Sequence, residues 1–157
     1  MPVLLRDLAP SKVFKAFGKG HKTRIKNLRR QAAAAQKYGI KLYLYLNEPR
    51  YMAETFFEKY PSARGMRAVQ QGHYGLCTSQ PQVREWIFES IKFVLSRVPE
   101  LGGTILITAS EHETNCYSHI PTYDCQAQGL ALNSKSLGLK SGDTMCPRCE
   151  KRGPEAV

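Results

Sequence analysis

The sequence predicts an α/β fold with about two to three parallel strands, crossover helices between them and a cysteine-containing loop tail. Three observations lead to this prediction. An alternating apolar run follows an amphipathic helical segment, a second apolar run follows a longer amphipathic segment, and the sequence beyond Ser110 is polar and loop-like. Two strands joined by a long crossover helix are expected to be parallel, with a right-handed connection.

The first helix is predicted from Thr23 to Tyr38, because apolar residues recur there at three- and four-residue spacing with Lys and Arg on the other face. Gly39 is expected to end this helix as a C-terminal cap. The first strand follows at once over Ile40 to Leu46, where apolar residues alternate with Lys41, Tyr43 and Tyr45. A helix, a glycine and a strand in this order form half of a βαβ unit.

A polar segment, Asn47 to Arg50, follows the predicted strand, and a short helix is expected from Ala53 to Tyr60, closed by Pro61. A glycine-containing loop is then expected to extend to Leu76, Cys77 and Thr78; its glycines are Gly65, Gly72 and Gly75.

The longest helix is predicted to begin with Ser79 as its cap and Pro81 in its first turn, and to end at Pro99. Its apolar stripe comprises Val83, Trp86, Ile87, Ile91, Val94, Leu95 and Val98. The run from Thr104 to Ala109 is continuously apolar, which is typical of a strand covered on both faces.

We expect one domain over residues 1–157, with a core at 21–115 and a loop-rich tail at 116–157 in which only Cys146 to Lys151 has weak helical character. Two parallel strands do not close a barrel and would leave apolar edges exposed. The sequence therefore predicts either a fragment of a longer chain or a chain that needs partner chains.

The 157 residues are 42% hydrophobic, which is ordinary for a soluble globular protein. No apolar run reaches the roughly 20 residues of a membrane span, and the N-terminus lacks a signal peptide, so we expect a cytoplasmic protein with no membrane association. A leader upstream of Met1 would leave no trace and would change this expectation. The sequence does not indicate an oligomeric state.

The net charge of +10 is concentrated at the N-terminus, where residues 1–30 hold nine Lys and Arg against Asp7 alone. A basic segment of this kind can bind phosphate. The segment has no helix-turn-helix or RNA-binding signature and no aromatics beyond Phe14 and Phe17, so nucleic acid is an unlikely partner and a solvated helix face is the favoured interpretation.

Both predicted strands are followed by a glutamate, Glu48 after the first and Glu111 after the second. The active sites of parallel α/β proteins lie beyond the carboxyl ends of the strands. Two carboxylates there are what glycoside hydrolysis requires, one as proton donor and one to stabilise the oxocarbenium-like centre. Groups suited to hydrogen-bonding a sugar accompany them: Tyr45, Asn47, Ser110, His112, Asn115, Tyr117 and His119.

The sequence resembles the barrel of uncharacterised bacterial proteins related to the family 20 glycoside hydrolases, the β-N-acetylhexosaminidases. The segments that carry the resemblance are Lys37 to Ile40, Tyr45 to Pro49, Leu76 to Ser79, Ile107 to Glu111, Asn115 to Ser118 and Cys146 to Cys149. The resemblance covers most of the chain and implies a partial (β/α)8 (TIM) barrel that contains about its third and fourth strands. It also implies a carbohydrate substrate.

In that family the fourth strand ends in Asp-Glu, where the Glu is the general acid and the Asp orients the acetamido group that acts as nucleophile. Glu111 matches the general acid, whereas Ser110 stands at the position of the Asp. A serine cannot supply the charge that polarises the acetamido nitrogen. The resemblance therefore implies a glycosidase with Glu111 as acid, and leaves the sugar and the mechanism open. Glu48, from its place after the first strand, is expected to be the second carboxylate or a sugar-binding residue.

Five cysteines in a chain without a leader favour metal binding over disulfides. Cys116 and His119 form one pair at zinc-ligand spacing, and Cys146 and Cys149 form a second. We expect no catalytic cofactor and a structural zinc on these four residues, with unlinked thiols as the equally weighted alternative. Cys125 is a substitute for His119, and Cys77 is expected to be a small buried residue.

The glycosidase fragment, which we expect to be inactive in isolation, is the favoured hypothesis. One alternative is a small zinc-containing, nucleic-acid-binding module that uses the basic segment from Lys12 to Arg30 and the Cys/His pairs. The other is a degenerate barrel that binds glycan without cutting it, which the serine before Glu111 favours.

Overall fold

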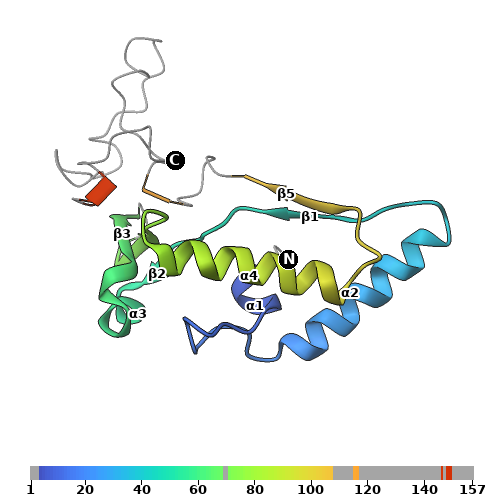
Figure 1. Ribbon diagram of the computed structural model, residues 1–157, viewed down its shortest axis with the longest axis horizontal. Coiled ribbons are helices and arrows are strands. Elements are labelled where there is room, and N and C mark those ends of the chain that lie inside the picture. Colours follow the sequence, from blue (N-terminus) through green and yellow to red (C-terminus); the bar gives the residue numbers. More distant parts are fainter. Residues whose placement is uncertain (1–3, 69–70, 108–114, 117–145, 147, 150–157) are drawn as a thin grey trace, which may run out of the picture. The chain divides into compact units, whose positions relative to one another are not determined.

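A computed structural model describes residues 4–68, 71–107, 115–116, 146 and 148–149. The chain divides into two compact units. The first unit comprises Met1–Glu48 and Arg84–Ile107, and the second comprises Pro49–Val83 and Thr108–Val157. Helices and strands are mixed in the chain (Figure 1), so the α/β class predicted from the sequence is confirmed at that level.

The first unit contains a parallel pair of strands, β1 (Tyr43–Leu46) and β5 (Gly103–Leu106), which lie side by side in Figure 1. Tyr45 is the register partner of Ile105, and Leu46 is the partner of Leu106. The amide of Ile107 extends the ladder by donating to the Leu46 carbonyl at 2.8 Å. The predicted parallel arrangement of these two strands is therefore correct.

Helix α2 (His21–Gln36) begins two residues before its predicted start. Gly39 follows it with a φ of +71°, and the Ile40 amide donates to the Ala35 carbonyl at 3.1 Å. A positive φ after the last helical turn favours glycine, which has no Cβ. The predicted glycine cap is confirmed. A short helix that was not predicted, α1 (Leu5–Leu8), packs against α2.

The two faces of β1 differ as the alternation predicted, with Leu44 and Leu46 buried and Tyr43 and Tyr45 exposed. The strand is shorter than expected, because its register with β5 begins at Tyr43. Ile40, which the alternation placed inside the strand, is 56% exposed.

Strand β5 departs from its prediction. A continuous apolar run was expected to be covered on both faces, yet Ile105 is 49% exposed and Leu106 is 42% exposed. Within the described residues β5 pairs with β1 alone, so it is an edge strand and not the central strand of a parallel sheet. Ala109, at the predicted end of this strand, lies outside the described residues.

Helix α4 (Pro81–Arg97) begins with proline, as predicted, and its residues from Arg84 onward belong to the first unit. Trp86 is 2% exposed and packs edge-on against Phe14, with ring centroids 5.8 Å apart, while Phe17 lies 5.0 Å from the same indole. Further buried residues of this unit are Leu5, Leu8, Ala32, Val94 and Val98. The apolar stripe of α4 thus contributes Trp86, Val94 and Val98 to the core of the unit.

The second unit contains an antiparallel sheet that the sequence did not predict. Its strands are β2 (Met52–Ala53), β3 (Arg64–Arg67) and β4 (His73–Leu76), in the order β2-β4-β3. Helix α3 (Glu54–Lys59) and a 3-10 turn, η1 (Pro61–Ala63), connect β2 to β3. The short helix was therefore predicted correctly, whereas the glycine-containing loop is a hairpin.

The described strands form a two-stranded parallel sheet and a three-stranded antiparallel sheet, and this part of the chain contains no closed barrel. Among the described residues, no helix combines the length and the apolar composition that a membrane span requires.

Candidate metal centre

Cys77 directly follows β4 in the second unit, and two backbone hydrogen bonds hold it there. Its amide donates to the Ala63 carbonyl at 2.9 Å, and its carbonyl accepts the Gln80 amide at 3.0 Å. The first bond ties Cys77 to the end of η1, and the second folds the chain into a turn immediately after the cysteine. These two bonds therefore fix the backbone position of Cys77, from which its thiol extends.

Three more thiols surround Cys77. Its sulfur lies 3.5 Å from the Cys146 sulfur and 3.5 Å from the Cys149 sulfur, and the Cys116 and Cys146 sulfurs are 3.6 Å apart. The Cys149 amide donates to the Cys146 carbonyl at 3.0 Å, which closes the Cys-x-x-Cys turn. All four sulfur atoms lie within 4.8 Å of one another. We call these four residues the cysteine cluster.

The dimensions of the cysteine cluster match a metal site and not a disulfide. Four sulfurs at about 2.3 Å from a central zinc ion stand about 3.8 Å from one another, close to the shorter distances found here. A disulfide would bring two sulfurs to about 2.05 Å, and none of the four cysteines forms one. All four are buried: Cys77, Cys116 and Cys149 are 0% exposed and Cys146 is 6% exposed.

Side chains around the cluster support it. The Ser79 hydroxyl lies 3.3 Å from the Cys149 sulfur and can donate a hydrogen bond to a thiolate there. Arg148, between the two cysteines of the turn, donates to the carbonyls of Ser62 at 3.0 Å and Arg64 at 2.7 Å. The guanidinium therefore fastens this turn to η1 and β3.

The thiols influence one another's acidity. The hydrogen bond from Cys116 lowers the pKa of Cys77 to about 4, because a donated proton stabilises the thiolate. The same bond raises the pKa of Cys116, which keeps its proton as the donor, and burial adds to that effect. Burial also raises the pKa of Cys149. One thiolate among buried thiols is an electron-rich group suited to a soft cation.

Four thiolates in a tetrahedron suit zinc or a single iron ion. A site with four protein ligands has no open position for water or substrate, which is the arrangement of structural zinc and not of catalytic zinc. The chemistry available to the cysteine cluster is thus metal binding that joins distant segments of the chain.

The cluster brings together three of the four predicted ligands, Cys116, Cys146 and Cys149. The fourth position belongs to Cys77, which the sequence suggested only as a small buried residue. His119 and its substitute Cys125 lie outside the described residues. Cys77 precedes Cys116 by 39 positions and stands in no short motif, so only the tertiary fold brings it to the other three.

The residues proposed for sugar chemistry are described only in part. Glu48 is 2% exposed, and its Oε1 accepts a hydrogen bond from the Leu5 amide at 2.8 Å, so this carboxylate fastens the start of α1. Tyr45 is 61% exposed on β1, and the Asn47 side-chain oxygen is buried without a hydrogen-bond partner in the described structure. Asn115 is buried. Ser110, Glu111, His112 and Tyr117 lie outside the described residues.

The chain matches no protein-family model, no curated protein and no solved structure at a significant level.

Proposed function

We propose that this chain binds one zinc ion through Cys77, Cys116, Cys146 and Cys149, and that the ion is structural. The observation that carries the proposal is the burial of four sulfur atoms within 4.8 Å of one another at the meeting point of three distant chain segments. The free energy of zinc binding then becomes folding free energy for the second unit, as in small metal-stabilised domains. Zinc is favoured over iron because a closed set of four cysteine ligands is the usual arrangement of structural zinc.

The test is the zinc content of the full chain, purified with a reductant and measured by elemental analysis. We expect about one zinc per chain, in accordance with a single four-thiolate site. Cobalt substituted for zinc should give the visible spectrum of a tetrahedral thiolate complex. A protein that carries iron, or no metal, would contradict the proposal.

Three variants separate the possible ligand sets. Cys77→Ser should lose zinc, whereas Cys125→Ser, the same substitution at the fifth cysteine, should keep it. His119→Ala should also keep it. If His119→Ala loses the metal and Cys77→Ser retains it, the ligands are the pair motifs alone and the proposed set is wrong.

We also propose that the chain forms part of a carbohydrate-active enzyme that hydrolyses O-glycosidic bonds by hexosaminidase-like chemistry, with Glu111 as general acid. The parallel pairing of β1 with β5 supports this second function, because parallel α/β architecture collects functional groups beyond the carboxyl ends of its strands. Asn47 and Glu48, which directly follow β1, occupy that position relative to their strand.

The hydrolysis test uses the natural gene product that contains this sequence and a panel of aryl glycosides that includes a β-N-acetylglucosaminide and a β-galactoside. Activity that disappears in Glu111→Gln and persists in Glu113→Gln, the matched change two residues away, would support Glu111 as the acid. A folded protein that hydrolyses nothing would exclude the glycosidase function and favour a glycan-binding one.

A further inference from the structure

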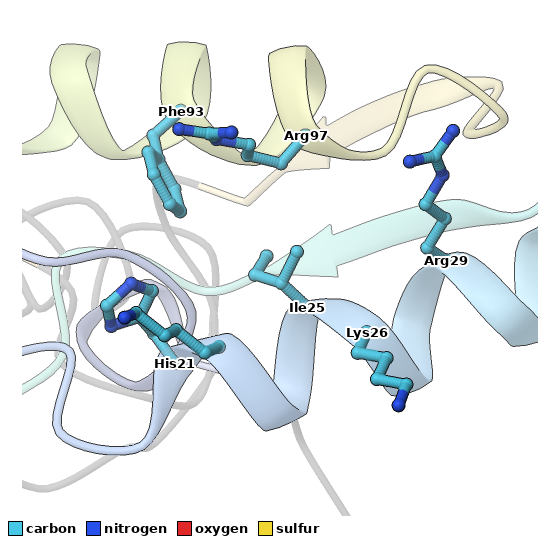
Figure 2. A pocket seen from close by; sticks show the side chains of 7 residues that line it. His21, Ile25, Lys26, Arg29, Phe93 and Arg97 are labelled. Carbon is cyan, nitrogen blue, oxygen red and sulfur yellow. The ribbon is translucent and has the colours of Figure 1, made fainter.

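The first unit contains a groove between α2 and α4 that neither proposed function uses. Its volume is about 450 Å³. Ile25 from α2 and Phe93 from α4 project into it, as Figure 2 shows, and form its apolar floor. Both side chains are half-buried. The groove therefore has a hydrophobic surface that the described part of the chain covers incompletely.

The rim of the groove is positively charged. Lys22, Lys26 and Arg29 line it from α2, and Arg97 lines it from α4. No acidic residue occurs in the 16 residues of α2. The ammonium groups of Lys22 and Lys26 are exposed and have no hydrogen-bond or ion-pair partner in the described structure.

The other two rim cations are already engaged. Arg29 donates to Glu100 at 2.9 Å, and this hydrogen bond lowers the pKa of the Glu100 carboxyl. The Arg97 guanidinium lies over the Phe93 ring at 5.5 Å. Two unneutralised lysines beside an apolar floor remain available to a negatively charged partner.

Few side chains of helix α2 are buried. Ala32 is its one buried residue, and Ile25 and Leu28 on the same stripe are half-buried. An amphipathic helix normally covers such a stripe with a neighbouring element. Because the stripe is flanked by cations, charge complementarity selects a partner that carries carboxylates beside apolar side chains.

Nucleic acid fits this groove less well. Proteins that bind single strands offer aromatic faces on which bases stack. The groove has Phe93 as its one phenyl ring, so it offers no series of aromatic faces on which successive bases could stack. A sugar-phosphate backbone is polar and would gain little from contact with the apolar floor.

We propose that the groove between α2 and α4 is the docking site for an acidic amphipathic helix of another protein. Lys22, Lys26 and Arg29 follow one another at four- and three-residue spacing, so they form one row about 10 Å long on α2. A partner helix with Glu or Asp at the same spacing would place its carboxylates along this row and its apolar residues on Ile25 and Phe93.

The test measures the fluorescence anisotropy of a labelled peptide of about 21 residues, long enough to form a helix, with Leu on one face and Glu flanking it. The full chain is titrated into the peptide at about 0.15 M salt, where long-range attraction is screened. A second peptide replaces each Glu by Gln, and a single-stranded oligonucleotide of similar length serves as the competing polyanion.

Two double variants provide the contrast. Lys22→Glu with Lys26→Glu reverses the rim, and Lys37→Glu with Lys41→Glu makes the same change of net charge at exposed lysines outside the groove. We expect the rim variant to weaken binding at least about tenfold and the control less than about twofold. Ile25→Gln, which leaves every charge in place, should weaken binding about fivefold or more through loss of apolar contact.

Equal loss in the two charge variants would overturn the proposal, since it would show attraction to net charge alone. Equal binding of the Glu and Gln peptides would overturn it as well. If the oligonucleotide binds more tightly than the acidic peptide and the rim variant removes that binding, the groove serves nucleic acid instead. Circular dichroism of each variant establishes that α2 is retained.

Discussion

Gly65 on β3 is the residue at which a single methyl group should do most harm to the cysteine cluster. A Cβ at this position would stand 2.8 Å from the Cys116 sulfur and 2.8 Å from the Gly75 carbonyl oxygen. The backbone oxygen cannot move aside without disturbing the pairing of β3 with β4. The cluster therefore depends on a residue that binds no metal itself.

We predict that Gly65→Ala destabilises the zinc-loaded chain by about 1–3 kcal/mol, the usual cost of overpacking, and lowers its zinc content. Gly75→Ala is the matched control in the same hairpin, because among the described residues the nearest atom to a Cβ there would be in the Met66 side chain, at 3.7 Å. Thermal unfolding and elemental analysis of both variants provide the measurement. Equal melting temperatures in the two variants would show that the space beside Cys116 is not limiting.

Four residues illustrate what the sequence could and could not predict about the candidate sites. Cys146 and Cys149 form a local motif, so their pairing was predictable from spacing alone. Cys77 needed the β3–β4 hairpin, which no pattern indicated. Glu48 was predicted to be a catalytic carboxylate from its place after a strand, and the structure adds a hydrogen bond from Leu5, 43 positions away, that no local pattern contains.

The predictability of the elements follows the strength of their periodicity. Helices α2 and α4 repeat apolar residues over several turns, and β1 alternates cleanly, so all three were predicted to within a few residues. Strands β3 and β4 read Arg-Gly-Met-Arg and His-Tyr-Gly-Leu, with glycine and charge where alternation would be needed. Pairing with a neighbouring strand, and not intrinsic preference, makes these segments extended.

At the level of α4, we predict a large difference between two aromatic residues that are two positions apart. Trp86→Ala should destabilise the first unit by about 3–5 kcal/mol, because it removes a side chain packed on Phe14 and Phe17 and leaves a cavity. Phe88 is 64% exposed and contacts Lys92, so Phe88→Ala should cost about 1 kcal/mol or less. Urea unfolding followed by circular dichroism measures both. Similar losses would mean that the stripe is not the core of this unit.

The molecule as a whole consists of two units with different sources of stability. The first has an apolar core that includes Trp86, Phe14 and the buried face of β1. In the second, Met66 and the four cysteines form a buried group in which sulfur replaces most of the hydrocarbon. Thiols without a metal offer less cohesion than packed aliphatic side chains, so the second unit should be the part that depends on zinc.

We therefore predict that a strong chelator, added to the full chain under reducing conditions, abolishes amide protection in β2, β3 and β4 and leaves that of α4 and the β1–β5 pair nearly unchanged. Hydrogen exchange measured segment by segment with mass spectrometry separates the two units. Restoring zinc should restore protection, and acidification should act like the chelator because protonated thiols do not bind the metal. Cys77→Ser should resemble the chelated protein without any addition. Loss of protection in both units together would show a single cooperative domain, whereas no loss in the hairpin would show that the second unit is stable without metal.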